Sequence, residues 1–486
     1  MPFDKFKPTN WINATLSYQG GYTWLTAPDN NLSLGNQINN SNTITANTRL
    51  NLENLYNKVN FLKKLLEEQK AGPGGGKPGG PQADVKPKPA PVPKPGEQDA
   101  DSTKDEDSFV FIKIIGKQLL KTLMSIRNVD INYSTNAATS IAGWMPQSDN
   151  FGNDFKFQYR SADNTQTIAN NKMAPGLPFV VGWQPDVWRA SQVGDVAMLN
   201  EFAANGWISN NSTLSTPFTQ TWGQNLTGRT SVTPFRDFKI DLNVTKTSSV
   251  NYSELFHYVD TLGSHVHDNR LFTGQYSLSY IFIGTAFEKN IDLSKTYLEL
   301  QDESRGIISS RLAADNPQYA SFLTRSQAGN TLVDGQYLQG YYRNSQEVLI
   351  PSFLAAYGVG KAKTIGLSAF PAIPLPNWNV NYNGLGRIPS LKKHFTSISI
   401  KHAYRGTYTM GGYTSNSRFT GDDLSGYSDN YFGIGVTAGG DSIYNIQSQY
   451  IIPQVSFTES FAPLAGINLN FKNGLTAGLD LKMNRN

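Results

Sequence analysis

The stretch TSISIKHAYRGTYTMGGY, residues 396–413, decides the fold, because two kinds of side chain alternate along it. Apolar and aromatic residues such as Ile398, Tyr404 and Met410 share one parity, and polar residues such as Lys401 and Arg405 share the other. A period of two residues is typical of a β-strand. The stretch therefore predicts a strand with one apolar and one polar face.

The length of this alternation bears on where the strand lies. It continues for about 13 residues, whereas strands of soluble proteins usually end after about 5 or 6. At about 3.3 Å per residue it is about 43 Å long, which projects to about 30 Å at a tilt near 45°. That length would cross an outer membrane, but a long strand of a soluble β-sandwich also alternates. This segment alone leaves both interpretations open.

Composition indicates β-structure with many turns. The chain of 486 residues has 38% hydrophobic residues, 12% aromatic residues and 43 glycines, and its mean hydropathy is −0.40. Its length suits either several soluble domains or one large barrel. It contains no run of about 20 apolar residues, so any membrane crossing would be made by strands.

Charge and cysteine content exclude several functions. The net charge of +4 is small for this length, and basic residues do not cluster with aromatic ones, which argues against nucleic acid as a partner. With 0 cysteines the chain has no disulfide framework, thiol nucleophile or cysteine-ligated metal.

The chain divides into four segments. We expect strands and a loop over residues 1–48, an amphipathic helix over 49–70, a disordered linker rich in Pro, Gly and Lys over 71–108, and strands with long loops over 109–486. Within the last segment, 109–124 fits a helix or a strand, and we favour a helix followed by a strand from near Ser125. Other strands are predicted at 12–25, 238–246, 275–284, 378–384 and 453–460.

Turns and loops separate these strands. Asn473-Gly474 is a dipeptide typical of a tight hairpin turn. Long polar stretches lie over 152–175 and 413–431. Long strands with long polar loops favour a large barrel over a compact sandwich. The N-terminus lacks the pattern of a signal peptide, which leaves a cytoplasmic protein or a piece of a longer one.

One cluster of histidines suggests a weak metal hypothesis. His257, His265 and His267 lie near Asp268, and His265 and His267 would share a face if this stretch were a strand. We favour a polar, solvated turn there and predict no metal. Motifs for nucleophilic, zinc-dependent, nucleotide or calcium chemistry do not occur in the sequence.

Four charged residues are candidates for lining a pore. Lys239 and Asp241 alternate with apolar residues in one predicted strand, and Lys401 and Arg405 do so in another. In a barrel we expect all four to face the lumen, since a Lys or Arg facing lipid at the midplane costs about 2–4 kcal/mol.

Several blocks of the chain resemble the SprA/Sov family, the gliding-motility and type 9 secretion translocons of Bacteroidota. The most specific block is FPAIPLPNWNVNYNGLGRIPSLKKHFTSISIKHAYRGTYTMGGYTSN, residues 370–416. EVLIPSFLAAYG, PTNWINATLSYQGGYTW, LYNKVNFLKK, TPFRDFKIDLNV and the final block from IPQVSFTES onward add to the likeness. The resemblance covers most of the chain apart from the linker.

Together with the long loops and the one or two short amphipathic helices expected from the residue pattern, the resemblance implies an all-β fold that is part of a very large transmembrane antiparallel β-barrel. It implies an outer-membrane translocon that exports folded proteins, with no cofactor, metal or catalytic residue. Implied partners are secreted cargo proteins, a shuttle barrel, plug proteins and outer-membrane lipid. It also implies that the chain is an internal-to-C-terminal fragment. The alternatives are a nutrient receptor or porin, or a soluble β-sandwich adhesin.

Overall fold

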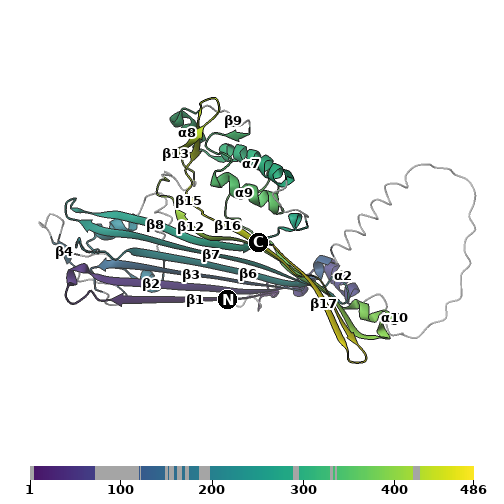
Figure 1. Cartoon of the computed structure of the whole chain (residues 1–486). Helices are drawn as coiled ribbons and strands as arrows, with labels where there is room; N and C mark the ends of the chain where they lie inside the picture. Colours follow the sequence, from purple (N-terminus) through teal and green to yellow (C-terminus); the bar gives the residue numbers. More distant parts are fainter. Residues whose placement is uncertain are drawn as a thin grey trace, which may run out of the picture.

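One large antiparallel β-sheet dominates the computed structural model (Figure 1). The structure describes residues 5–71, 120, 122–147, 152, 158–160, 167–169, 174–184, 197–287, 295–328, 332–333, 336–419 and 427–485. Within them the sheet has 11 strands in the order β1-β2-β3-β6-β7-β11-β12-β16-β17, with β8 beside β7 and β12, and β15 beside β12. The chain is thus mostly β-sheet, as expected, while almost all of the predicted linker lies outside the described residues.

Most strands of the sheet are long. Their bounds are β1 Ile12–Leu25, β2 Asn36–Asn51, β3 Asn128–Trp144, β6 Phe218–Val232, β7 Phe238–Val259, β8 Ser264–Ser279, β11 Asn377–Tyr382, β12 Phe395–Ser415, β15 Tyr450–Ile451, β16 Val455–Phe471 and β17 Thr476–Arg485. β12 has 21 residues and contains the whole alternating stretch over 396–413, which confirms the strand predicted there.

The sheet has two chemically different faces, because the alternation stays in phase from strand to strand. Leu16 of β1 pairs with Ala46 of β2, and the next residue, Ser17, pairs with Thr45. Paired residues point to the same side of a sheet, so the phase carries across it. We call the side of Leu16 the apolar face and the side of Ser17 the polar face.

Two strands share one position in the sheet. β8 pairs with residues 246–259 of β7, whereas β11 pairs with residues 238–243, and both pair with β12 on their other side. At their junction Leu375 N donates to Ser279 O at 2.9 Å. We call the part of the sheet whose apolar face packs against other segments of the chain the upper half, and the remaining part, which contains β11, the lower half. The boundary runs obliquely to the register, because Ile44 of β2 lies at the level of Tyr276 of β8.

The chain between β8 and β11 forms a helical unit with part of the β12–β16 connection. It lies on the side of the apolar face, above the sheet in Figure 1. Its elements are α7 Lys295–Asp315, α8 Tyr319–Ser326, α9 Gln346–Tyr357, β9 Leu332–Val333, β10 Tyr337–Leu338, β13 Tyr431–Val436 and β14 Ser442–Ile446.

Smaller elements complete the described chain. They are α1 Leu52–Tyr56, α2 Asn60–Ala71, α4 Leu177–Val180, α6 Ala197–Ala204, α10 Pro389–Lys392, β4 Gln158–Arg160, β5 Thr167–Ala169, and the 3-10 helices η2 Leu32–Leu34, η4 Ile283–Thr285 and η5 Gly384–Arg387. The expectation of one or two short helices is therefore wrong. α9 was missed because it contains Pro351 and is apolar on most sides, so it shows no amphipathic stripe.

The single helix predicted over 49–70 is also corrected. β2 continues to Asn51, whose side chain accepts a hydrogen bond from Asn54 N at 3.1 Å and caps α1. α1 ends at Tyr56 and α2 begins at Asn60. Between them Lys58 Nζ donates to Pro8 O at 2.9 Å, which draws the chain toward the segment before β1.

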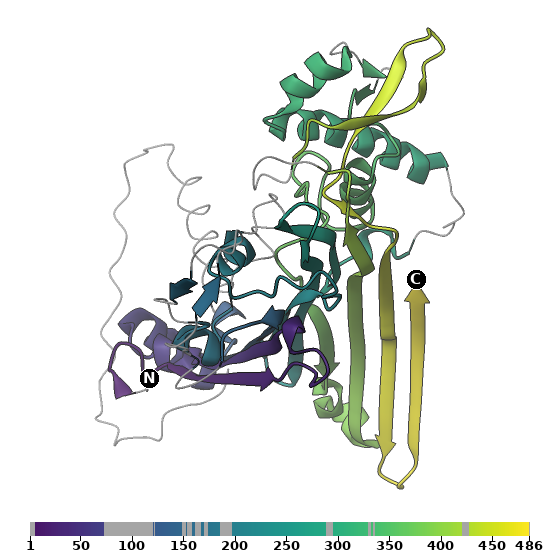
Figure 2. The same ribbon diagram turned by 90° about the vertical axis from the view of Figure 1, so that its left-hand side faces the viewer.

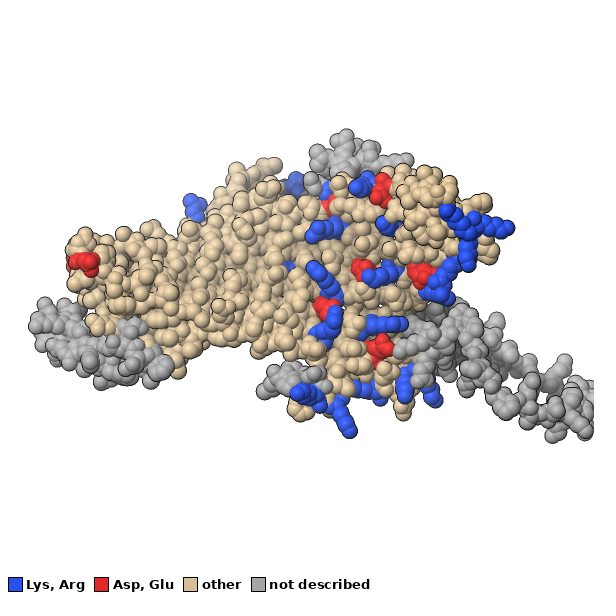
Figure 3. Space-filling view, turned by 90° about the horizontal axis from the view of Figure 1, so that it is seen from below, with Lys and Arg blue, Asp and Glu red and all other residues tan. Residues whose placement is uncertain are grey.

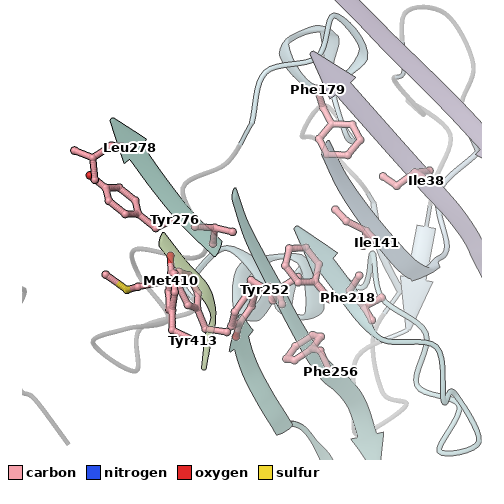
Figure 4. Close-up of a cluster of buried hydrophobic side chains, with 14 of the residues drawn as sticks. Ile38, Ile141, Phe179, Phe218, Tyr252, Phe256, Tyr276, Leu278, Met410 and Tyr413 are labelled. Atoms are coloured by element: carbon pink, nitrogen blue, oxygen red, sulfur yellow. The ribbon is translucent and has the colours of Figure 1, made fainter. Parts of the chain in front are cut away.

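The main core lies on the apolar face of the upper half. Buried side chains there come from the strands and from the segments that cover them (Figure 4); they include Ile38, Ile141, Phe179, Phe218, Tyr252, Phe256, Tyr276, Leu278, Met410 and Tyr413. A second core inside the helical unit is formed by residues such as Ile308, Phe322 and Val348. The lower half of the sheet contributes much less to these cores.

The predicted turn at Asn473-Gly474 joins β16 and β17. Phe471 N donates to Leu475 O at 2.8 Å, and Gly474 has a φ of 85°, which glycine adopts at little cost. In Figure 2 the N-terminal strands are turned away from β12, β16 and β17, so the sheet coils strongly.

Candidate functional site: the polar face of the sheet

The four charged residues predicted from sequence lie on the polar face. Across β11, Lys239 is level with Lys401, and Asp241 is level with Ala403, two residues before Arg405. Lys239 Nζ lies 2.8 Å from Asp241 Oδ1. The structure thus brings the charged positions of β7 and β12 to one side, although they are far apart in sequence.

A row of charged residues crosses the polar face at the level of Arg405, two residues from the level of Asp241. Arg49 of β2 pairs with Asp130 of β3, which pairs with Arg229 of β6. Arg49 Nε lies 2.7 Å from Asp130 Oδ1. These three residues line an open depression of about 800 Å³ together with Asp241 and Arg405. We call these five residues the charged row.

Sequence reasoning missed three members of this row. Arg49, Asp130 and Arg229 come from β2, β3 and β6, and nothing local marks any of them. The one feature that they share in the sequence is their parity, since each occupies a position on the polar side of an alternating strand. The register between the strands places them together, and register is not visible in one sequence.

Above the charged row the polar face carries only uncharged side chains over several levels. Successive cross-strand neighbours at one level are Ser17, Thr45, Ser134, Asn225, Thr247, Ser277, Thr409 and Ser456. The level below it has Thr15, Asn47, Asn132, Thr227, Thr245, Thr407 and Thr458, and the level above has Gln19, Thr43, Asn136, Gly223, Ser249 and Gln275. We call these three levels the amide–hydroxyl rows.

Figure 3 shows the resulting separation of charge. Blue and red atoms gather over one end of this view from below, whereas a broad region beyond them is almost free of charged atoms. A shallow depression of about 360 Å³ lies within the rows, lined by residues that include Asn136, Asn225, Thr247 and Thr409. The polar face therefore has a charged lower level and a neutral upper surface.

No buried cluster covers most of the apolar face of the lower half, although Ile398 of β12 is only 3% exposed. Leu16 at one edge of the sheet is 73% exposed, and Leu479 at the other edge is 72% exposed. Between them lie residues that belong to none of the buried clusters found in the described chain: Ile44, Ile131, Leu226, Val244, Ile400 and Ile467. We call this surface the apolar band; none of the residues named in it is charged.

Aromatic side chains border the apolar band at two levels. At the lower border the ring of Phe238 stacks on Phe235 at 4.7 Å, and the rings of Phe395 and Phe471 are 4.6 Å apart. Others at this border include Tyr382. At the upper border the rings are those of Trp378, Tyr404, Phe461 and Phe287, with neighbouring centroids 4.3, 5.0 and 5.4 Å apart.

The apolar face of the upper half is covered by the chain itself. Asn40 and Asn42 occupy the apolar parity of β2, and each uses its amide to bind the segment after α4. Asn40 Nδ2 donates to Trp183 O at 2.7 Å, and Asn42 Nδ2 donates to Gly182 O at 2.7 Å. Polar residues thus enter this face where protein covers it.

Charged residues on the apolar face begin only at the border between the halves. Lys246 Nζ donates to Ala372 O at 3.0 Å. Glu459 and Arg485 form a buried ion pair with Nη2 2.8 Å from Oε2. Arg485 Nη1 also donates to Thr285 O at 2.8 Å, so the last strand is tied to η4.

The histidine cluster lies on the β7–β8 hairpin rather than in a loop. His257 Nε2 is 3.0 Å from Asp268 Oδ2, and His267 Nδ1 is 3.0 Å from the buried Glu254. His265 contacts a backbone carbonyl instead, and burial lowers its pKa. The residues that the structure describes contain no group of three or more His, Asp or Glu arranged to hold a metal.

A separate cavity lies in the helical unit. It has a volume of about 680 Å³ and is lined by residues that include Arg311, Asp315, Tyr341 and Glu347. Burial raises the pKa of Glu347, and a hydrogen bond with Ser448 opposes this in part. The cavity shares no residue with the polar face.

Comparisons with known proteins do not assign a family. No family model matches the chain, and no curated protein matches it significantly. In the described part of the chain no helix is long and apolar enough to cross a membrane.

Proposed function

We propose that this chain is part of the wall of a very large outer-membrane β-barrel that conducts folded proteins to the cell surface. The polar face, with Lys239, Asp241, Lys401 and Arg405, lines an aqueous lumen in this proposal, and the apolar band faces lipid. The observation that carries it is the opposition of the apolar band and the polar face at one level of the sheet. A soluble protein rarely leaves so extended an apolar surface bare.

The height of the apolar band supports this assignment. A barrel strand crosses the bilayer with about 9–11 residues, and its lipid-facing band is bordered by aromatic residues at both interfaces. On β12 the two aromatic borders lie at Phe395 and Tyr404. On β7 the band begins at Phe238, and Lys246 marks its upper limit.

Both edges of the sheet are open in the described chain. In the described chain β1 pairs only with β2, and β17 pairs only with β16. Lipid does not tolerate unpaired strand edges, so both edges must pair with each other or with further strands. Protein export, the shuttle barrel, the plug proteins and a role in gliding motility rest on the resemblance to the SprA/Sov translocons.

Two neighbouring residues test the membrane assignment. The chain has 0 cysteines, so Asn225→Cys and Leu226→Cys each introduce a single label site on opposite faces. In native envelopes we expect a water-soluble maleimide to label position 225 and a lipid-soluble reagent to label position 226. Labelling of both positions by the water-soluble reagent would mean that the band faces water.

The transport function needs a second readout. A photo-crosslinking amino acid at position 225 is expected to capture exported proteins in transit, whereas the same group at 226 is expected to capture lipid. Capture of small solutes without any exported protein at 225 would favour a porin or nutrient receptor instead.

A further inference from the structure

The amide–hydroxyl rows differ from the charged row in more than charge. Their side chains are almost all Ser, Thr, Asn and Gln, which each offer hydrogen-bond donors and acceptors. They run from β1 at one edge to β16, next to the other edge. Because this uncharged polar surface is so extended, a molecule that occupies the space beside the polar face of the sheet must contact it.

Some of these groups bind one another across strands. Ser277 Oγ lies 3.1 Å from Thr409 Oγ1, and Asn132 Nδ2 donates to Thr227 Oγ1 at 3.4 Å. Two levels above the rows on the same face, Asn39 Nδ2 donates to Thr23 Oγ1 at 3.1 Å. Gln37 Nε2 donates to Ser140 Oγ at 2.9 Å nearby. Groups that satisfy one another leave few unpaired donors or acceptors to hold a ligand in place.

The composition of the rows argues against tight binding of a particular ligand. Single-stranded nucleic acids are bound through aromatic platforms and positive charge, and zinc is bound through thiolates, imidazoles or carboxylates. None of the residues that make up the three rows is aromatic, acidic or basic. The surface therefore fits a partner that it contacts through its hydrating water and that dissociates easily.

Resting on the proposed function, we infer that the amide–hydroxyl rows are a non-adhesive contact surface for folded polypeptide cargo of either surface charge. The surfaces of folded proteins carry both signs of charge, and a fixed charge beside them would retain one sign and repel the other. Neutral amides and hydroxyls do neither. The charged row is then the level at which the charge of the cargo affects its passage.

The test introduces charge into the rows of the full-length protein in its native host. Asn132, Asn225 and Thr247 are exposed residues of three neighbouring strands. One variant changes all three to Lys, a second changes them to Glu, and the control changes them to Gln. Two versions of one exported cargo, with the same fold and export signal but an acidic or a basic surface, are followed by their rates of appearance outside the cell.

The native protein and the Gln control are expected to export both cargoes at similar rates. The Lys and Glu variants are expected to shift the ratio of the two rates in opposite directions, each by about tenfold. An unchanged ratio in both charged variants, with export intact, would overturn the inference. If the triple variants do not assemble, the single substitutions Asn225→Lys and Asn225→Glu are expected to shift the ratio in the same opposite directions.

Failure of the proposed function gives a different result. Depletion of the native protein would then leave the export of both cargoes unchanged, which would overturn the function and this inference together. Export that depends on the protein but ignores charge in the rows overturns the inference alone.

Discussion

The upper and lower halves of the sheet share one alternation but meet different neighbours on the apolar face. In β2, Asn40 and Asn42 of the upper half bind the covering segment, whereas Ile44 and Ala46 of the lower half are half-buried and belong to none of the buried clusters of the described chain. Alternation therefore identifies a face, and the residue types along that face indicate where other parts of the protein cover it. Four predictions test this difference.

The largest expected effect lies at the border between the halves. Arg485→Met would leave Glu459 buried without its cation, which typically costs about 3–5 kcal/mol. If the chain lies in the outer membrane, as proposed, we expect loss of the folded protein from that membrane, measured as the heat-modifiable fraction. The double change Glu459→Gln with Arg485→Met should recover much of it; a double variant as poor as the single one would show that Arg485 acts through η4 instead.

The upper half should behave like the core of a soluble protein. Leu278 is 0% exposed and packs in the main core, so Leu278→Ala is expected to cost about 2–5 kcal/mol. Leu479, which is 72% exposed in the lower half, is the matched control, and Leu479→Ala should cost much less. Denaturant unfolding of the purified protein measures both, and equal losses would contradict the comparison.

The lower half should reject charge on one face only. Ile131→Arg places a cation inside the apolar band and is expected to cost about 2–4 kcal/mol if the band faces lipid. Its neighbour Asn132 faces the other way, so Asn132→Arg should assemble normally. The assembled fraction in the outer membrane measures the difference, and equal assembly of the two variants would refute the lipid-facing assignment.

The smallest effect concerns the helical unit. Burial raises the pKa of Glu347 above its ordinary value of 4.5, so the folded unit holds this proton more tightly than the unfolded chain. The stability of the folded helical unit is therefore greatest at pH values below the ordinary pKa of 4.5, and it falls as the pH rises through the raised pKa of Glu347. Glu347→Gln should reduce that dependence and raise the thermal midpoint at neutral pH; an unchanged pH profile would show that Glu347 is not responsible.

Local patterns made the strands and their faces predictable. The strand over 12–25 matches β1, and the stretches over 238–246 and 396–413 lie within β7 and β12. The shared side of Lys239, Asp241, Lys401 and Arg405 also follows from parity within each strand. These features depend on residues close together in sequence, where the period of two is directly visible.

Features that depend on register or on tertiary burial were not predictable. The charged row joins Arg49, Asp130 and Arg229 only because β2, β3 and β6 pair in one register. The apolar sides of α9 are divided between the sheet and the helical unit, so no single stripe marks the helix. α7 carries Ile308 and Leu312 one turn apart, a spacing that could have indicated it.

The shared position of β8 and β11 imposes an order on biosynthesis. The upper part of β7 meets β8 after the short turn over 260–263, but its lower part pairs with β11, as in Asp241 with Asn379. During synthesis that lower edge stays open until the chain between β8 and β11 has been made. Open edges invite pairing with other chains, so the length of this insertion sets how long a nascent chain needs chaperone protection.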